Sequence, residues 1–307
     1  MIRHQPQHPG FSLIELLTVL GLLGVLIGLL LPAVQAARAT SSRIGCGNNL
    51  RQIGLAAHQY LDTRGTLPPS GVTITDPAFG RYSLQWTDIL LPYVEQPALW
   101  ATIKPAYDTS KLVRNPPHIG LTTVVKVYTC PADGRLSTPI TDNLGYTAAY
   151  GSYQAITGSG AITQHGPSIQ IHEDGTFRYR LGVRTAEITD GLSQTLLLGE
   201  RPPPGMYWFG NWYTPYYPIA SLLLSQYRWG MTITVMLPLD YNGCKGPFQF
   251  GPGRIENPCD SHHLWSLHGG GGWFVFADGS AQFLPYTARD LLPALATRAG
   301  DEVVSFD

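Results

Sequence analysis

The longest apolar segment of the chain lies near its N-terminus, from Phe11 to Leu31. Glu15 is the only residue charged at neutral pH between Arg3 and Arg38. As a helix with a rise of about 1.5 Å per residue, this segment would span about 32 Å, which matches the roughly 30 Å hydrocarbon core of a bilayer. The pattern therefore predicts a membrane-spanning helix over residues 11–31.

A helical pattern of a different kind follows without a break. From Leu50 to Tyr60, apolar residues recur at three- and four-residue spacing, which is typical of a helix that packs one face on a sheet. Gly65 and the two prolines at positions 68 and 69 end the pattern. We expect residues 32–65 to form an amphipathic stem that continues the membrane helix.

The remaining residues, 66–307, have the pattern of a loop-rich domain with helices and strands. A helical pattern covers residues 86–103, with interruptions at Pro92 and Pro97, and a short helix is expected near residues 287–299, with Thr287 as its N-cap. Runs with strand character occupy residues 122–128, 169–172, 176–183, 195–198, 231–237 and 273–276. Residues 201–261, rich in proline and aromatic side chains, are expected to form an irregular insertion.

Two Asp-Gly pairs lie between such runs, Asp174-Gly175 and Asp278-Gly279. This dipeptide between β-rich flanks is a strong short-range signal for a hairpin. The sequence therefore predicts an α+β fold, in which a long N-terminal helix packs on an antiparallel sheet.

Composition excludes one class of partner. Charged residues make up 13% of the chain and the formal net charge is -1. No basic cluster occurs, and binding to nucleic-acid phosphates requires a concentrated positive surface. We expect no nucleic-acid partner.

The four cysteines are expected to form disulfides, because a membrane anchor would deliver the domain to an oxidising compartment. Cys244 and Cys259 share one segment and are expected to close a short loop. Cys46 and Cys130 would then join the stem to the sheet.

The N-terminal residues Gly10-Phe11-Ser12-Leu13-Ile14-Glu15, with Pro32 after the apolar segment, resemble type IV prepilins and pseudopilins. The resemblance implies a leader, residues 1–10, that a prepilin peptidase removes from the cytoplasmic side. Phe11 would become the N-methylated first residue. Glu15 would pair with the amine of a neighbouring pilin subunit, and the helix with Pro32 would assemble into a filament.

The membrane helix has one alternative interpretation, and one charge pattern bears on its orientation. A secretory signal peptide is the alternative, but the segment is longer than a signal core and no small-x-small cleavage site precedes Arg38. Arginines at 38, 43 and 51 follow the helix, which by the positive-inside rule would favour the opposite orientation. The prepilin motif takes precedence, and predicts a single-pass inner-membrane protein with residues 66–307 outside the cytoplasm.

Further blocks resemble one bacterial family, which joins a prepilin-type N-terminus to a large domain of unknown function with an H-x9-D-G signature. Here the signature is His268 with Asp278-Gly279. The other matching blocks are residues 46–55, 90–96, 187–200 and 295–300. These blocks span most of the mature chain.

The signature has a catalytic and a structural interpretation. His268 and Asp278 have the residue types of a general base and the group that orients it, and His268 is followed by three glycines as in the oxyanion segment of lipases. That chemistry needs a G-x-S-x-G nucleophile, which the sequence lacks. We favour the structural interpretation, in which Asp278-Gly279 turns a hairpin and His268 holds the preceding strand, and expect no enzymatic activity.

Two sets of residues have metal-binding character. Candidate zinc ligands are Cys259, His262, His263 and His268. Candidate calcium ligands are Asp133, Asp190 and Asp278. The zinc spacing is loose, Cys259 has a partner in Cys244, and the aspartates form no dense loop, so we expect no resident metal.

The leading functional hypothesis is a pseudopilin-like structural subunit. The alternative is a membrane-anchored module that uses the prepilin signal only for export and binds a glycan or a surface protein; an exported hydrolase ranks third. The aromatic side chains that would serve such a module, or instead fill the core, are Trp208, Trp212, Tyr213, Tyr216 and Tyr217.

Overall fold

A computed structural model describes the chain between residues 13 and 302, with gaps. The described residues are 13–76, 80–109, 118–141, 145, 147–160, 162–165, 168–171, 173–178, 180–205, 210–213, 232–237 and 243–302. The chain divides into two compact units, Met1–Ser42 and Arg43–Asp307. Helix α1 (Leu13–Arg64) contributes to both.

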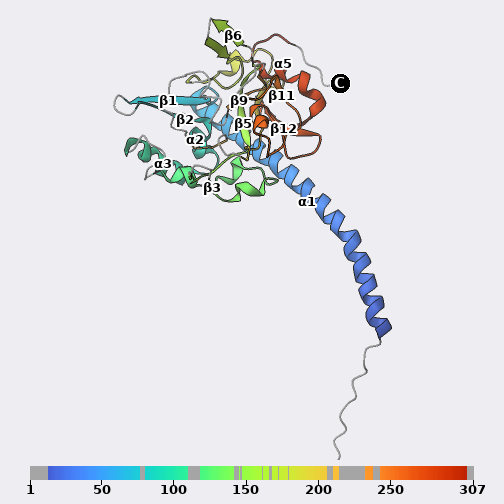
Figure 1. Cartoon of the computed structure of the whole chain (residues 1–307). Helices are drawn as coiled ribbons and strands as arrows, with labels where there is room; N and C mark the ends of the chain where they lie inside the picture. The colour runs from blue at the N-terminus through green and yellow to red at the C-terminus, as the bar shows by residue number, and fades with distance from the viewer. Residues whose placement is uncertain are drawn as a thin grey trace, which may run out of the picture. The chain divides into compact units, whose positions relative to one another are not determined.

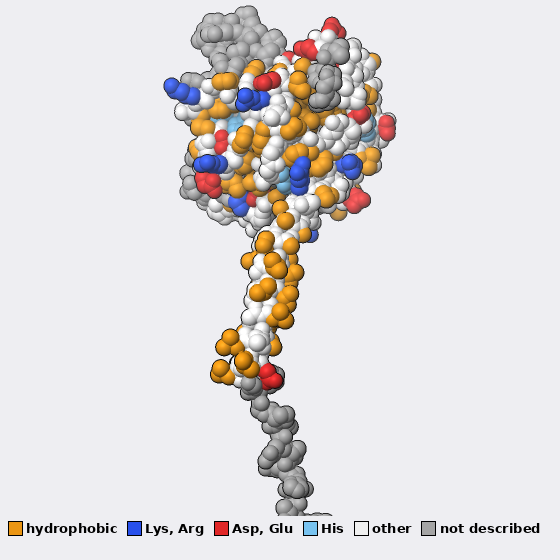
Figure 2. All heavy atoms as spheres, turned by 90° about the vertical axis from the view of Figure 1, so that its right-hand side faces the viewer, with side chains coloured by type: hydrophobic (Ala, Val, Ile, Leu, Met, Phe, Trp, Pro, Cys, Tyr) orange, Lys and Arg blue, Asp and Glu red, His pale blue; other side chains and the backbone are white. Residues whose placement is uncertain are grey.

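In the first unit, α1 exposes its apolar side chains, and those on one side of the helix are visible in Figure 2. It is the one helix among the described residues that is long and apolar enough to cross a membrane. The expected helix over residues 11–31 is confirmed from Leu13 onward. Pro32 lies inside α1 and does not end it, although an internal proline removes one backbone hydrogen bond.

In the second unit, α1 buries one face against the domain. Cys46, Leu50, Ile53 and Ala57 recur at three- and four-residue spacing on this face and are fully buried. Gly65 ends the helix in a left-handed conformation (φ 76°), which glycine adopts without steric cost. The prediction that the long helix packs one face on the domain is confirmed.

A five-stranded sheet forms the centre of the second unit, in the order β13-β12-β8-β5-β9. Its strands are β5 (Tyr153–Gly158), β8 (Leu196–Glu200), β9 (Thr232–Thr234), β12 (Gly271–Phe276) and β13 (Ala281–Pro285) (Figure 1). Neighbours are antiparallel except for β5 and β9, which are parallel. The sheet is therefore present as predicted, but it is mixed and not purely antiparallel. One of its strands, β9, comes from residues 201–261, which were expected to form an irregular insertion.

Hydrophobic clusters cover both faces of this sheet. On one face, Val275 of β12 joins the cluster that contains the buried face of α1. On the other face, Phe274 and Phe276 join the cluster that contains α5 (Leu292–Ala296). This alternation along β12 follows from the two-residue period of a strand, and the α+β fold class predicted from the sequence is confirmed.

Smaller elements surround the sheet. Two-stranded pairs are β1 (Gly71–Asp76) with β2 (Gly80–Gln85), β3 (Ile140–Thr141) with β4 (Thr147–Ala148), β6 (Ile162–His165) with β7 (Ser168–Ile171), and β10 (Met236–Leu237) with β11 (Phe248–Gln249). The other α-helices of the described residues are α2 (Trp86–Ile89) and α3 (Pro97–Thr109). The short 3-10 helices are η1 (Leu91–Tyr93), η2 (Ile119–Thr122), η3 (Lys126–Tyr128), η4 (Gly134–Ser137), η5 (Thr185–Glu187), η6 (Pro258–His262) and η7 (Tyr286–Asp290).

Three element predictions were wrong. In place of the strand expected at 122–128 are the last residue of η2 and the whole of η3; of the buried residues there, Val125 precedes η3 and Tyr128 ends it. The described residues of 176–183 contain no strand. The C-terminal helix is split into η7 and α5, and Thr287 lies within η7 instead of capping it. Short apolar runs do not by themselves distinguish a strand from a turn that is buried by its neighbours.

The two Asp-Gly pairs have different roles. Asp278-Gly279 turns the β12–β13 hairpin as predicted, with Gly279 at φ 84° and the Asp278 carboxylate accepting a hydrogen bond from the Ser280 amide. Asp174 instead accepts hydrogen bonds from the amide and hydroxyl of Ser159, at 2.8 and 2.6 Å, at the end of β5. The hairpin predicted at Asp174-Gly175 was therefore wrong.

Candidate functional site

Helix α1 brings Cys46 against the edge of the domain core, where it forms a disulfide with Cys130. The two Cα atoms are 5.0 Å apart. Glycines flank Cys46 because the approach is close: a Cβ at Gly47 would lie 2.8 Å from the Trp273 ring, and a Cβ at Gly45 would lie 3.1 Å from Pro131. These glycines weaken a helix by up to about 1 kcal/mol each relative to alanine. In return they allow α1 to approach Trp273 and Pro131 closely.

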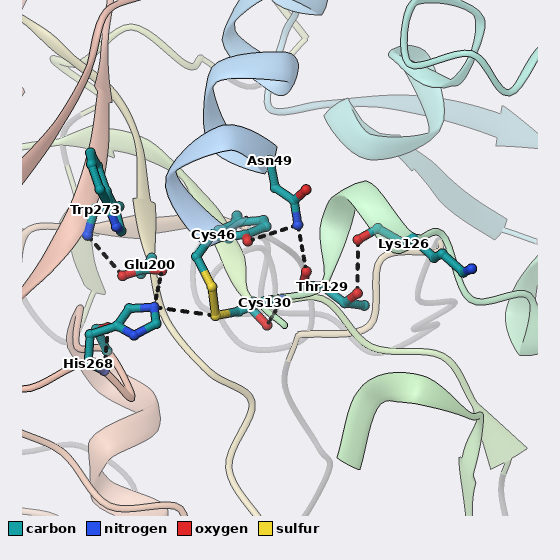
Figure 3. The surroundings of a disulfide bond; sticks show 11 residues. Cys46, Asn49, Lys126, Thr129, Cys130, Glu200, His268 and Trp273 are labelled. Atoms are coloured by element: carbon teal, nitrogen blue, oxygen red, sulfur yellow. Dashed lines mark hydrogen bonds and ion pairs between the residues drawn. A yellow bond between two sulfur atoms is a disulfide. The ribbon is translucent and has the colours of Figure 1, made fainter. Parts of the chain in front are cut away.

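Two further ligand-type side chains lie against this disulfide (Figure 3). The Nε2 atom of His268 is 3.5 Å from the Sγ atom of Cys130 and 3.5 Å from Oε1 of Glu200. The potential ligand atoms of Cys46, Cys130, Glu200 and His268 all lie within 4.8 Å of one another. We call these four residues the Cys–Glu–His cluster; each of them is at most 7% exposed.

Backbone and side-chain hydrogen bonds fix the members of the cluster. Oε2 of Glu200, at the end of β8, accepts a hydrogen bond of 2.8 Å from the Trp273 amide of β12. The Cys130 amide donates to the Ser152 hydroxyl at 3.0 Å, and the His268 amide donates to the Ser266 hydroxyl at 2.9 Å. Glu200, Cys130 and His268 are therefore each fixed by a hydrogen bond, which involves the side chain in Glu200 and the backbone amide in Cys130 and His268.

Asn49, one turn after Cys46, ties α1 to both neighbouring segments. Its side-chain amide donates to the Thr129 carbonyl at 2.8 Å and to the Tyr153 hydroxyl at 3.3 Å. Burial raises the pKa of Tyr153 well above its usual value, and the nearby Glu200 carboxylate raises it further. Tyr153 therefore remains a neutral hydroxyl beside the cluster.

Arg201 follows Glu200 and is also fully buried. Burial lowers the pKa of its guanidinium to about 9. Its Nη1 atom donates to the Ser261 carbonyl at 2.8 Å, whereas Nε and Nη2 find no acceptor in the described part of the chain. Oε1 of Glu200 likewise accepts no hydrogen bond there, and it lies 3.5 Å from Nε2 of His268.

The cluster has two chemical capacities that depend on the state of its sulfurs. As a disulfide, Cys46–Cys130 is a cross-link that joins α1 to the domain. As thiols, the same cysteines would add two sulfur ligands to an imidazole and a carboxylate. That set has the residue types of a tetrahedral zinc site.

The second disulfide joins Cys244 and Cys259, which are 15 residues apart. Both disulfides expected from the sequence are thus present. The zinc set proposed around Cys259 does not assemble: His263 contacts the Asp260 carboxylate at 3.1 Å, and His262 packs on the Phe248 ring. Within the described segments, the four-residue cluster around Cys46 is the one group with metal-ligand geometry, and His268 belongs to it.

The H-x9-D-G signature does not form one site. Asp278 serves the hairpin, while the His268 ring lies against Cys130 and Glu200. The interpretation of His268 as a residue that holds the preceding strand missed this contact. Glu200 was noted only as the end of a matching block, because nothing in its local sequence indicates that it meets two cysteines and a histidine.

The three candidate calcium ligands lie apart and have other partners. Asp133 forms a salt bridge with Arg135 at 2.5 Å. Asp190 accepts hydrogen bonds from the amides of Gly300 and Asp301, at 2.8 and 2.9 Å, which hold the C-terminal segment in place. These carboxylates therefore have structural roles in their own turns.

The remaining sequence candidates divide between described and undescribed parts of the chain. Trp212 and Tyr213 are fully buried, so these two aromatic residues fill the core. Residues 208, 216 and 217 lie outside the described residues, as do Gly10 and Phe11. Glu15 lies in the first turn of α1.

Comparison with known families places the chain. A family described as a protein of unknown function (DUF1559) matches residues 35–290, which is most of the sequence and contains the whole Cys–Glu–His cluster. The chain belongs to this family. No curated protein and no solved structure matches this chain.

Proposed function

We propose that this member of the DUF1559 family is a pseudopilin-like structural subunit. It is made as a prepilin in the inner membrane, cleaved after Gly10 by prepilin peptidase and methylated at Phe11. It then assembles through α1 with like or related subunits into a pilus- or secretion-associated filament. The domain after the stem lies outside the cytoplasm and performs no catalysis.

The exposed apolar surface of α1 supports this proposal most directly. From Leu13 to Leu31 the large aliphatic side chains are 47% or more exposed, on every side of the helix. A surface of this size and chemistry needs lipid or other apolar helices around it. A filament core and a bilayer are the two environments that a pilin-like helix occupies.

The position of Glu15 supports assembly in addition to anchoring. Insertion scales put the cost of a carboxylate at the centre of a membrane helix at about 2.5 to 3.5 kcal/mol. Glu15 lies in the first turn of α1, where the helix dipole favours a negative charge by about 0.3 to 1 kcal/mol. The Phe11 amine of a neighbouring subunit would give this carboxylate a partner of opposite charge when subunits pack.

Processing is tested by Gly10→Val. A branched side chain should block a peptidase subsite that fits glycine, so the variant should keep its leader, whereas wild type should begin with N-methylated phenylalanine in mass spectrometry. Gly21→Val is the matched control, because a Cβ at Gly21 meets no atom within 4 Å. A wild-type mature chain that begins beyond Arg38 would instead identify a signal peptide.

Assembly is tested by Glu15→Leu, expressed without wild-type subunits. The variant should insert, be cleaved and fold, since the costly charge is gone, yet it should not enter filaments that are sheared from cells. Glu15→Asp retains the carboxylate and is the control. Filaments of Glu15→Leu at wild-type amounts would refute the role of Glu15. Surface display of the wild type without any filament would favour the membrane-anchored binding module.

A further inference from the structure

We propose that the Cys–Glu–His cluster binds a zinc ion whenever Cys46 and Cys130 are thiols. The ion would take two sulfurs, Nε2 of His268 and Oε1 of Glu200. Zinc binding and the disulfide are then alternative states of one site. This site is independent of filament assembly.

Two of the distances between the ligand atoms in the disulfide form already match the edges of a tetrahedral site. With zinc–sulfur bonds of about 2.3 Å and zinc–nitrogen or zinc–oxygen bonds of about 2.0 to 2.2 Å, the edges of the tetrahedron are about 3.6 Å from sulfur to nitrogen and about 3.4 Å from nitrogen to oxygen. The observed separations are 3.5 Å from Cys130 Sγ to His268 Nε2 and 3.5 Å from that atom to Glu200 Oε1. All four ligand atoms lie within 4.8 Å of one another, and the two sulfurs would have to move apart to about 3.8 Å, which loss of the disulfide bond permits.

The carboxylate provides an independent indication. Glu200 is 2% exposed, and its Oε1 atom accepts no hydrogen bond from the described residues although it points at the sulfurs and the imidazole (Figure 3). A buried carboxylate oxygen without a donor is costly, and a cation at this position would satisfy it. Its other oxygen already accepts from the Trp273 amide, as outer-sphere partners of metal-bound carboxylates do.

The chemistry of the site favours zinc over magnesium and calcium. Thiolate and imidazole ligands select zinc, whereas magnesium and calcium prefer sets made entirely of oxygen. Binding converts both thiols to thiolates and releases two protons, and no electron moves. Two thiolates and a carboxylate carry a charge that the ion largely neutralises, so the buried site does not hold uncompensated anions.

Conversion between the two states requires an external redox partner. Formation of the disulfide removes two electrons and two protons from the dithiol, is carried out by a thiol–disulfide oxidant, and releases the ion. Before that oxidation, zinc would hold α1 against the domain with Cys46 and Cys130 already side by side. The four residues thus offer two routes to the same packing, one for each redox condition.

The test uses the full chain in detergent, with the second cysteine pair removed as C244S/C259S to leave only the cluster thiols. After anaerobic reduction with a phosphine, cobalt(II) and then zinc are titrated in. We expect equimolar cobalt binding with a thiolate-to-metal charge-transfer band and the intense visible bands of a tetrahedral ion, and displacement of cobalt by zinc. The oxidised protein should give none of these bands.

Variants distinguish a built site from free thiols. His268→Ala and Glu200→Gln should each weaken zinc binding by at least the roughly 10- to 100-fold that loss of an outer-sphere partner costs, and C46S/C130S should abolish the charge-transfer band. If the reduced chain loses near-UV circular dichroism, zinc should restore it. Failure of zinc to restore the signal, absence of the cobalt bands, or equal affinity in His268→Ala would each overturn the proposal.

Discussion

The two parts of α1 use apolar residues for different purposes. Before Ser42 the helix is rich in leucine and exposes large side chains all round. Its glycines at 21, 24 and 28 have nothing within 4 Å of an added Cβ. After Arg43 the buried face combines Leu50 and Ile53 with several small residues, and an added Cβ at Gly47 or Gly54 would touch the sheet.

This difference shows which property of the sequence specifies each part of the helix. Apart from Glu15, the first part is specified by hydrophobicity, because its large apolar side chains are all exposed and meet no packed partner in this structure. The second part is specified by shape, because the core of a folded domain is close-packed and has no room for an extra methyl group. The Cys46–Cys130 disulfide lies at the start of the shape-specified part.

The largest expected effect concerns the disulfide that secures this second part. Cys46–Cys130 closes 84 residues, whereas Cys244–Cys259 closes 15. Loop-closure entropy predicts about 4.6 kcal/mol for the former and about 3 kcal/mol for the latter. In urea unfolding of the oxidised chain, C46S/C130S should therefore lose about 1.5 kcal/mol more than C244S/C259S. Equal losses would show that the attachment of α1 depends little on its disulfide.

A smaller effect separates the two groups of glycines. A Cβ at Gly54 would lie 2.8 Å from Cγ1 of Val275. Overpacking of this kind costs about 1 to 3 kcal/mol, partly offset by about 1 kcal/mol of helix propensity. Gly54→Ala should lower the free energy of unfolding of the domain, whereas Gly24→Ala should not change it.

A double-mutant cycle sharpens this test. Val275→Ala removes the methyl group that an alanine at position 54 would meet, so the two substitutions should cost less together than their sum. Strict additivity in chemical denaturation would mean that α1 moves away from the sheet at no cost. The comparison between the two parts of the helix would then lose its physical basis.

The smallest effect concerns the hydrogen bonds of the stem. Asn49→Ala removes donors to the Thr129 carbonyl and the Tyr153 hydroxyl, and should cost about 1 kcal/mol. Asn48, exposed on the same turn, provides the control, because surface substitutions usually stay within about 0.5 kcal/mol of wild type. If both alanine variants unfold at the same denaturant concentration, packing alone holds the stem.

Local sequence was sufficient to predict the elements that depend on hydrophobic periodicity and on the conformation of single turns. The helix from Leu13, the stem and its end at Gly65 follow from hydrophobic periodicity and glycine conformation. The Asp278-Gly279 hairpin follows from turn chemistry. Asp174-Gly175 has the same dipeptide but a different role, because its carboxylate is satisfied by Ser159, which is close only in the folded chain.

The sequence by itself determined the apolar helix, the fold class, the processing hypothesis and the pairing of the cysteines. Only the tertiary structure decided that Glu200 and His268 lie against the Cys46–Cys130 disulfide, and that β9 joins the sheet in parallel. The physical reason is sequence distance. Periodicity and turn signals act over a few residues, whereas the cluster is assembled from four segments whose contact depends on how α1, β8 and β12 pack together.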